Sequence, residues 1–298
     1  SDVALSGIRF TAGRSQAKNN SRILEFHDGP RGSIYSHESL SISDCLLDTN
    51  HVSSGWGGAI YTDEDSVLKV IRTSFTNNSA MSGGALCTAP NSSVSIDSCT
   101  FAHNIQTARL SGVGSAIENG GMLRIFNSTF SQNGAFRGGA VDTPTQGNQV
   151  EIRHCTFTQN RGGAISTHTD PVAHQQFRAV IANCILWGNT NEKGEPLDIL
   201  ATDGVQADIS QSIVGVVQGD TIDAVANLTD VDPKLASLAD NGGPTQTHAL
   251  LEGSPAIDAG SMTELKFDQR GQPYARTMNS MPDIGAFEYG NDAKARDR

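Results

Sequence analysis

The chain has 298 residues, of which 37% are hydrophobic, and it carries a formal net charge of −11 at pH 7. A net negative charge of this size argues against nucleic acid as a partner. It argues mildly against a polyanionic glycan that has no bridging cation. No run of 18 apolar residues occurs, so the sequence predicts no membrane span.

A short motif recurs from residue 42 to residue 214. Its first half is clearest in EIRHCTFTQN, residues 151–160. The cysteine position of this half is taken in successive copies, 26 to 29 residues apart, by Cys45, Thr73, Cys99, Ser128, Cys155, Cys184 and Ser212. Two residues later the copies have Leu47, Phe75, Phe101, Phe130, Phe157, Leu186 and Val214. A step of two residues returns to the same face of a β-strand, so we expect both columns to point into one core.

The second half of the motif follows a turn. It reads glycine, a small residue, alanine and an aliphatic residue, at 57–60, 83–86, 114–117, 138–141 and 162–165. Glycine suits a tight turn, and the aliphatic residue begins another short strand. Two short β segments in each period, without helical spacing, exclude helical repeats, and a propeller blade needs about 40 residues. The predicted fold is therefore all-β: a right-handed, single-stranded parallel β-helix, a solenoid whose coils stack about 4.8 Å apart.

Three segments are predicted. Residues 1–225 form the parallel β-helix, with about seven to eight coils that each contact only their neighbours. Residues 226–290, where the motif fades, form a C-terminal capping region that we expect to close the open end of the helix. Residues 291–298 are a polar tail.

Two further columns of the repeat are interpreted as structural. An asparagine ends each first half, and its side chain is suited to bond neighbouring backbone at a turn. The members of this column are Asn50, Asn78, Asn104, Asn133, Asn160 and Asn189. Four of the five cysteines lie in the inward column, and only Cys155 and Cys184 share adjacent coils, where a disulfide is possible although free buried thiols are the expectation.

One column that should point outward carries acids. The residue after the aliphatic position is Tyr61, Cys87, Glu118, Asp142 and Ser166 in successive copies. Glu118 and Asp142 should therefore be stacked one coil apart. Such a pair can hold calcium, can divide into acid and base for glycoside hydrolysis, or can be two solvated surface acids.

Other candidate functional residues lie on loops and strands beside this column. The candidate ligand-binding residues are Tyr61, Asp63, Asp65, Asp170 and His174. His168 and Arg124 join Glu118 and Asp142 as catalytic candidates, and their convergence in one groove would favour an enzyme. A simpler expectation for Arg124 is an exposed ion pair with Glu151 on the neighbouring coil, worth roughly 0 to 1 kcal/mol.

The segment after residue 217 has separate motifs in a fixed order. They are DPKL at 232–235, DNGGPT at 240–245, THALL at 247–251, GSPAIDAG at 253–260, DQRG at 268–271 and DIGAFEY at 283–289. This order resembles the C-terminal region of bacterial right-handed β-helix proteins called choice-of-anchor Q proteins, and the resemblance implies export. The repeats resemble those of polymorphic outer-membrane-protein adhesins and the coils of pectate-lyase-like proteins.

Three function classes follow. The first is a secreted or cell-surface, adhesin-like protein that binds a polysaccharide or other glycan, or a host or matrix surface. The second is an extracellular polysaccharide lyase or glycoside hydrolase, as the pectate-lyase-like resemblance implies. The third is a structural spacer. None of these three functions requires a cofactor. The carboxylate pair suggests calcium as a cation that the protein could bind.

Overall fold

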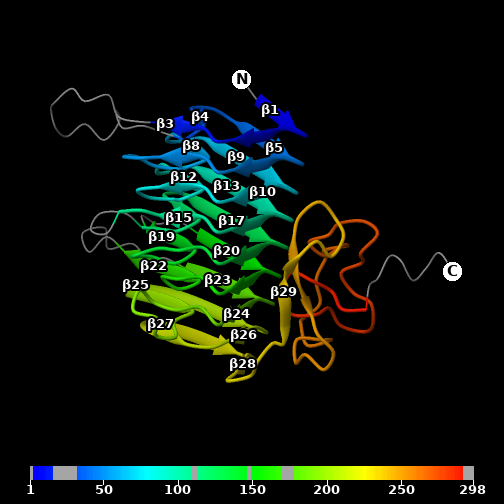
Figure 1. Ribbon diagram of the computed structural model, residues 1–298. Coiled ribbons are helices and arrows are strands. Elements are labelled where there is room, and N and C mark those ends of the chain that lie inside the picture. The colour runs from blue at the N-terminus through cyan, green and yellow to red at the C-terminus, as the bar shows by residue number, and fades with distance from the viewer. Residues whose placement is uncertain (1–2, 16–31, 109–112, 146–148, 170–177, 291–298) are drawn as a thin grey trace.

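Successive coils of the computed structural model place like positions of the motif one above another (Figure 1). The structure describes residues 3–15, 32–108, 113–145, 149–169 and 178–290. Within these residues all the regular structure is β, and the chain forms the predicted right-handed parallel β-helix. No helix in the described part of the chain is long and apolar enough to cross a membrane.

The largest sheet has two legs that the last long strands join. The first leg runs through β1 (Val3–Ser6), β5 (Leu40–Ser43), β9 (Val67–Ile71), β13 (Ser93–Asp97), β17 (Met122–Phe126), β20 (Gln149–Arg153) and β23 (Arg178–Ala182). The second leg runs through β4 (Ile34–Ser36), β8 (Ile60–Thr62), β12 (Leu86–Thr88), β16 (Ile117–Asn119), β19 (Val141–Thr145) and β22 (Ile165–Thr169). Both legs end on β25 (Ile199–Ser210), which pairs with β27 (Val217–Val225).

Three smaller sheets complete the fold. A nine-stranded parallel sheet contains β2 (Arg9–Thr11), β6 (Leu46–Asp48), β10 (Ser74–Thr76), β14 (Thr100–Ala102), β18 (Thr129–Ser131), β21 (Thr156–Thr158), β24 (Ile185–Trp187), β26 (Ile213–Val214) and β28 (Leu228–Thr229). A four-stranded sheet contains β3 (Arg14–Ser15), β7 (His51–Val52), β11 (Ser79–Ala80) and β15 (Ile105–Gln106). In the C-terminal region β29 (Leu235–Ala239) pairs antiparallel with β30 (Thr247–Leu250).

The aromatic column forms the centre of the core, as predicted. Phe75, Phe101, Phe130 and Phe157 are fully buried, and their rings stack with centroids 4.5, 4.8 and 4.5 Å apart. Parallel in-register strands impose this spacing, because each ring sits directly above the ring of the coil before. The five cysteines are buried free thiols, which confirms the expectation for Cys155 and Cys184.

The asparagine column forms the predicted ladder. The Asn78 side-chain nitrogen donates to Asn104 Oδ1 at 2.9 Å, and the backbone nitrogen of Asn78 donates to the same oxygen at 3.1 Å. The bonds repeat up the column to Asn189, where the carboxylate of Asp198 accepts in place of another asparagine. Every member is thus buried with its polar atoms paired, which is the condition for placing amides in a core.

A second column of turn residues lies immediately before the cysteine position. Its members have left-handed backbone, with φ between 41° and 57°, and they are Asp44, Arg72, Ser98, Asn127, His154, Asn183 and Gln211. Asparagine, aspartate and histidine tolerate this conformation better than most residues. We call this set the corner column. It turns each coil from the first leg into the nine-stranded sheet.

The C-terminal region lies along the side of the coils rather than across the end of the helix (Figure 1). The outward side chains of the nine-stranded sheet receive it: Thr129 Oγ1 donates to Gln269 Oε1 at 2.6 Å, and Ser131 Oγ lies 2.9 Å from His248 Nε2. The Ala286 backbone nitrogen donates to Thr156 Oγ1 at 3.1 Å. In TFA, TFS and TFT the phenylalanine points inward, so the small hydroxyl residues beside it form the surface on which this region packs.

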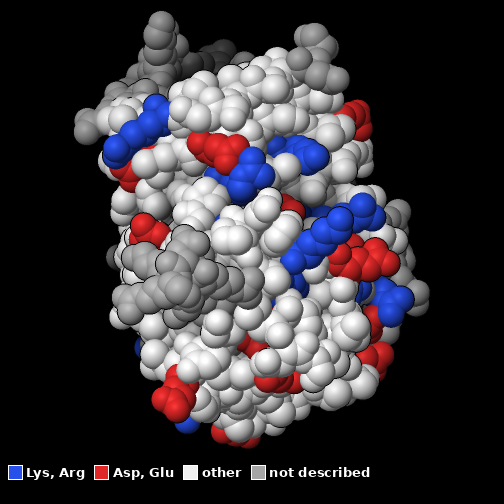
Figure 2. All heavy atoms as spheres, turned by 90° about the vertical axis from the view of Figure 1, so that its right-hand side faces the viewer, with Lys and Arg blue, Asp and Glu red and all other residues white. Residues whose placement is uncertain are grey.

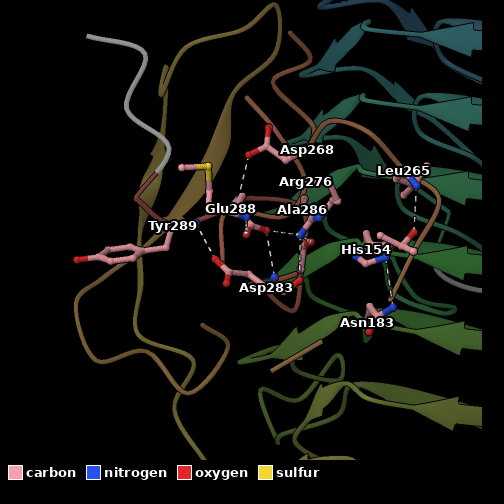
Figure 3. Close-up of polar contacts among 12 residues, drawn as sticks. His154, Asn183, Leu265, Asp268, Arg276, Asp283, Ala286, Glu288 and Tyr289 are labelled. Atoms are coloured by element: carbon pink, nitrogen blue, oxygen red, sulfur yellow. Dashed lines mark hydrogen bonds and ion pairs between the residues drawn. The ribbon is translucent and has the colours of Figure 1, made fainter. Parts of the chain in front are cut away.

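The DQRG and DIGAFEY motifs build the interior of the C-terminal region. Arg270 is buried between the rings of Tyr274 and Phe287, with its Nη2 atom 2.7 Å from Asp268 Oδ2. Arg276 is also fully buried, 3.7 Å from Glu288 Oε2, and it donates to the backbone oxygens of residues 283 and 285 (Figure 3). The two motifs therefore supply buried contacts that stabilise the C-terminal region itself. On its outer face acidic and basic side chains are interspersed (Figure 2).

Candidate functional site

The outward side of the second leg carries the predicted acidic column. Register pairing stacks Tyr35, Tyr61, Cys87, Glu118, Asp142, Ser166 and Leu200 on consecutive strands. We call this set the second-leg column. Glu118 and Asp142 are directly paired, which confirms their predicted stacking. The column is on the opposite side of the coils from the C-terminal region (Figure 1).

The second-leg column is not the solvated surface that the sequence suggested. Asp142 has no exposed surface, Ser166 is 5% exposed and Tyr61 is 8% exposed. The turn at Gly138 lies directly against the Asp142 carboxyl group. The interpretation of Glu118 and Asp142 as two solvated acids is therefore wrong for Asp142. The repeated motif predicts the strands, but it does not predict how the turns between them fold.

A cavity of about 790 Å³ opens beside Asp142. Its polar and aromatic lining includes Phe136, Arg137, Asp142, Arg161, Ser166 and Glu192. Asp142 and Ser166 come from β19 and β22, whereas the two arginines come from the turns that precede these strands. A concave site with convergent polar groups is the usual form of a ligand-binding site.

Glycine at position 138 allows the turn to close over the acid. Gly138 has φ of 74°, and a Cβ atom there would lie 2.6 Å from Asp142 Oδ1. Any side chain would thus meet both backbone strain and a steric clash. The glycine of the motif therefore sets the depth at which Asp142 lies.

Burial controls the chemistry of Asp142. It raises the pKa of this carboxyl group to about 7, although Ser166 and the Arg137 guanidinium act in the opposite direction. A group with this pKa exchanges its proton near neutral pH and can either donate or accept a hydrogen bond. Carboxyl groups with a pKa near the working pH are suited to acid and base catalysis, although structural burial produces such shifts too.

Arg161 is held at the rim of the cavity. Its guanidinium lies over the Phe136 ring at 5.4 Å and its Nη2 atom donates to the backbone oxygen of Glu192 at 3.0 Å. The Phe136 backbone nitrogen donates to Gln106 Oε1 at 2.9 Å, which fixes the turn. A guanidinium group has five N–H donors. One of those of Arg161 bonds to a backbone oxygen, and others can donate to a ligand.

The remaining predicted residues do not gather at this cavity. Glu118 faces the preceding coil, where the Cys87 thiol donates to Glu118 Oε2 at 3.3 Å. Arg124 lies on the first leg and forms the predicted ion pair with Glu151, at 3.5 Å from Nε to Oε2. Arg124 and Asp142 therefore do not converge in one groove, since the two legs put them on different faces. In the described part of the chain no three His, Cys, Asp or Glu side chains are grouped as a metal site.

The predicted ligand-binding residues lie in different surroundings. Asp63 accepts a hydrogen bond from the Tyr35 hydroxyl at 2.7 Å, and Asp65 is exposed in a turn with φ of 57°. The backbone of His168 belongs to β22, where it pairs with position 144. Asp170 and His174 lie outside the described residues.

Sequence reasoning missed Phe136, Arg137, Arg161 and Glu192. A signal existed, because the residue before the first glycine of each second half also forms a column: Trp56, Ser82, Val113, Arg137 and Arg161. We call this set the pre-glycine column. Two of its members are arginines on adjacent coils, RGG in both cases, and that repetition marks the cavity.

The comparisons with known proteins concern the fold. The family model described as a right-handed β-helix region matches residues 6–143 of this chain. No curated protein and no solved structure matches it. The matched segment contains the first coils, the stacked rings from Phe75 to Phe130 and the turn at Arg137. In sequence as well as in structure, the chain is thus similar to right-handed β-helix regions.

Proposed function

We propose that the protein is an exported or cell-surface β-helix that binds a carbohydrate in the cavity beside Asp142. The observation that carries the proposal is a cavity lined by a buried carboxyl group, two exposed guanidinium groups and a phenyl ring. Sugar hydroxyls can pair with the exposed arginines, and the apolar face of a pyranose can pack on an aromatic ring. The C-terminal motifs, which resemble those of choice-of-anchor Q proteins, support export.

The arginines favour a sugar that carries a carboxylate. Arg137 and Arg161 are on adjacent coils, so their guanidinium groups present donors along one side of the cavity. Guanidinium pairs geometrically with carboxylate through two parallel hydrogen bonds. The overall charge of −11 slows the approach of an anion, whereas the two arginines attract it at the cavity itself.

Arg161→Ala should weaken the binding of digalacturonate by about tenfold or more, since one charge-assisted contact is worth about 1.5 to 3 kcal/mol. Isothermal titration with digalacturonate and with neutral cellobiose measures the effect. The matched control is Arg124→Ala, which removes another exposed arginine, on the first leg, and should leave binding unchanged. Equal losses in the two variants, or no binding of either sugar by the wild-type protein, would argue against the cavity as the site.

A second candidate function is glycoside hydrolysis, and the pKa of Asp142 favours it. A carboxyl group protonated near neutral pH can deliver a proton to a glycosidic oxygen, and a second carboxyl group, Glu192, lines the same cavity. Acid catalysis of this kind declines as the pH rises through about 7, where Asp142 ionises.

Asp142→Asn tests this second function. It should abolish the release of reducing ends from a polysaccharide panel, while a rise in absorbance at 235 nm would instead indicate a lyase. Stability provides the control. The folded-state pKa of Asp142 is raised above its unfolded value, so the wild-type protein loses stability as the pH rises from about 4 to about 7. The variant should lack that part of the slope in urea denaturation. Unchanged hydrolysis by the variant would exclude Asp142 as the acid.

A further inference from the structure

An aromatic cluster lies at the other end of the second-leg column. Tyr61 and Cys87 are buried there, and the half-buried rings of Tyr35 and Trp56 pack against them. The ring centroids of Tyr35 and Tyr61 are 5.7 Å apart. Trp56 therefore keeps part of its indole ring exposed at the surface of the coils.

Polar groups border this cluster. The Tyr35 hydroxyl donates to Asp63 Oδ2 at 2.7 Å, and His37 Nδ1 lies 2.7 Å from the same oxygen. The His37 side chain is 63% exposed, and its ring meets that of Tyr35 edge-on at 4.2 Å. The exposed imidazole and the carboxylate thus stand beside partly exposed aromatic rings.

The cluster and the Asp142 cavity lie on one line. Tyr61 is three strand pairings from Asp142 in the second-leg column, through Cys87 and Glu118. Three steps of about 4.8 Å place the two sites roughly 14 Å apart along the helix axis. Trp56 and Arg137 are likewise members of one column, the pre-glycine column. The structure therefore aligns both sites on the same face.

We propose that the cluster of Tyr35, Trp56 and His37 is a second carbohydrate subsite, and that one linear glycan spans it and the Asp142 cavity. The inference rests on the proposed function of that cavity. The apolar face of a pyranose ring packs on the exposed part of Trp56, and its hydroxyl groups pair with His37 and Asp63. A chain of several sugars, running parallel to the helix axis, reaches both positions.

The experiment compares digalacturonate with hexagalacturonate. Two linked contacts raise the effective concentration at the second subsite, so the hexasaccharide should bind about a hundredfold more tightly than the disaccharide. Trp56→Ala should remove most of this gain and leave disaccharide binding intact. Trp56→Phe, which keeps an aromatic face, should retain most of it. The matched control is Trp187→Ala, which alters the other tryptophan of the chain, on β24, and should keep the whole gain.

Fluorescence gives a readout that a loss of stability would not imitate. The chain has two tryptophans, so Trp187→Phe leaves Trp56 as the sole reporter. Its emission should shift with hexagalacturonate and stay constant with digalacturonate. A gain with chain length that survives in Trp56→Ala, or equal affinity of both lengths for the wild-type protein, would overturn the second subsite while leaving the cavity proposal intact. Failure of both sugars to bind would overturn the two proposals together.

Discussion

Phe130→Ala is expected to destabilise the protein by about 3 to 5 kcal/mol, the range for truncating a buried aromatic side chain. Phe130 has no exposed surface, and its ring is stacked between Phe101 at 4.8 Å and Phe157 at 4.5 Å. Removal of the ring leaves a cavity inside the coil and takes a stacking partner from two neighbours. Urea denaturation followed by circular dichroism measures the change.

The control for this prediction is another phenylalanine. Phe267 is 37% exposed, so Phe267→Ala should change the stability by less than about 1 kcal/mol. A loss below about 1 kcal/mol in Phe130→Ala would show that the coils relax around the gap. In that event the rings would contribute little to the stability of the core.

Arg276→Met is expected to destabilise the C-terminal region by about 3 to 5 kcal/mol, because it leaves Glu288 as a buried acid without its cation. Arg276 has no exposed surface, and Glu288 is 1% exposed. Burial already raises the pKa of Glu288 to about 7, and the loss of Arg276 should raise it further. A raised carboxyl pKa removes stability as the pH increases, so the deficit should be larger at pH 8 than at pH 5.

The double variant, Arg276→Met with Glu288→Gln, separates the effect of the unpaired charge on Glu288 from the effect of losing the arginine side chain. The glutamine oxygen can still accept from the backbone nitrogen of Met278 or of Asp283, as Glu288 does at 3.0 Å. The double variant should therefore recover much of the stability lost in Arg276→Met, and its deficit should not depend on pH. An equal deficit in both variants at both pH values would mean that the hydrogen bonds of Arg276 to the backbone oxygens of residues 283 and 285, rather than the ion pair, are what Arg276 provides.

The sequence predicts the interior of the coils well because the interior is periodic. A residue step of two and a coil period of 26 to 29 residues determine which side chains meet, so the stacked Phe column, the Asn ladder and the Glu118 and Asp142 pairing all follow from alignment of the copies. Local spacing and the pairing of identical strands are sufficient for these contacts.

The cavity could be predicted only in part, because it depends on turns. Asp142 is identifiable from its column, but its burial depends on how the turn at Gly138 folds over it, and this requires the observed backbone. The position of the C-terminal region was not predictable from the repeat either. Its contacts join residues far apart in the chain, such as Gln269 and Cys99, which are 170 positions apart. No periodicity connects such segments.

The lateral position of the C-terminal region makes the coils mechanically unequal. Its hydrogen bonds reach four successive coils, at Thr100 on β14, Thr129 on β18, Thr156 on β21 and Asn183 in the turn before β24. The C-terminal region thus holds those coils in addition to their neighbours, whereas among the described residues no hydrogen bond connects it to β2, β6 or β10. We therefore expect tension along the axis to separate the coils first on the N-terminal side, while the C-terminal region holds the coil that carries Asp142 from the opposite side of the molecule.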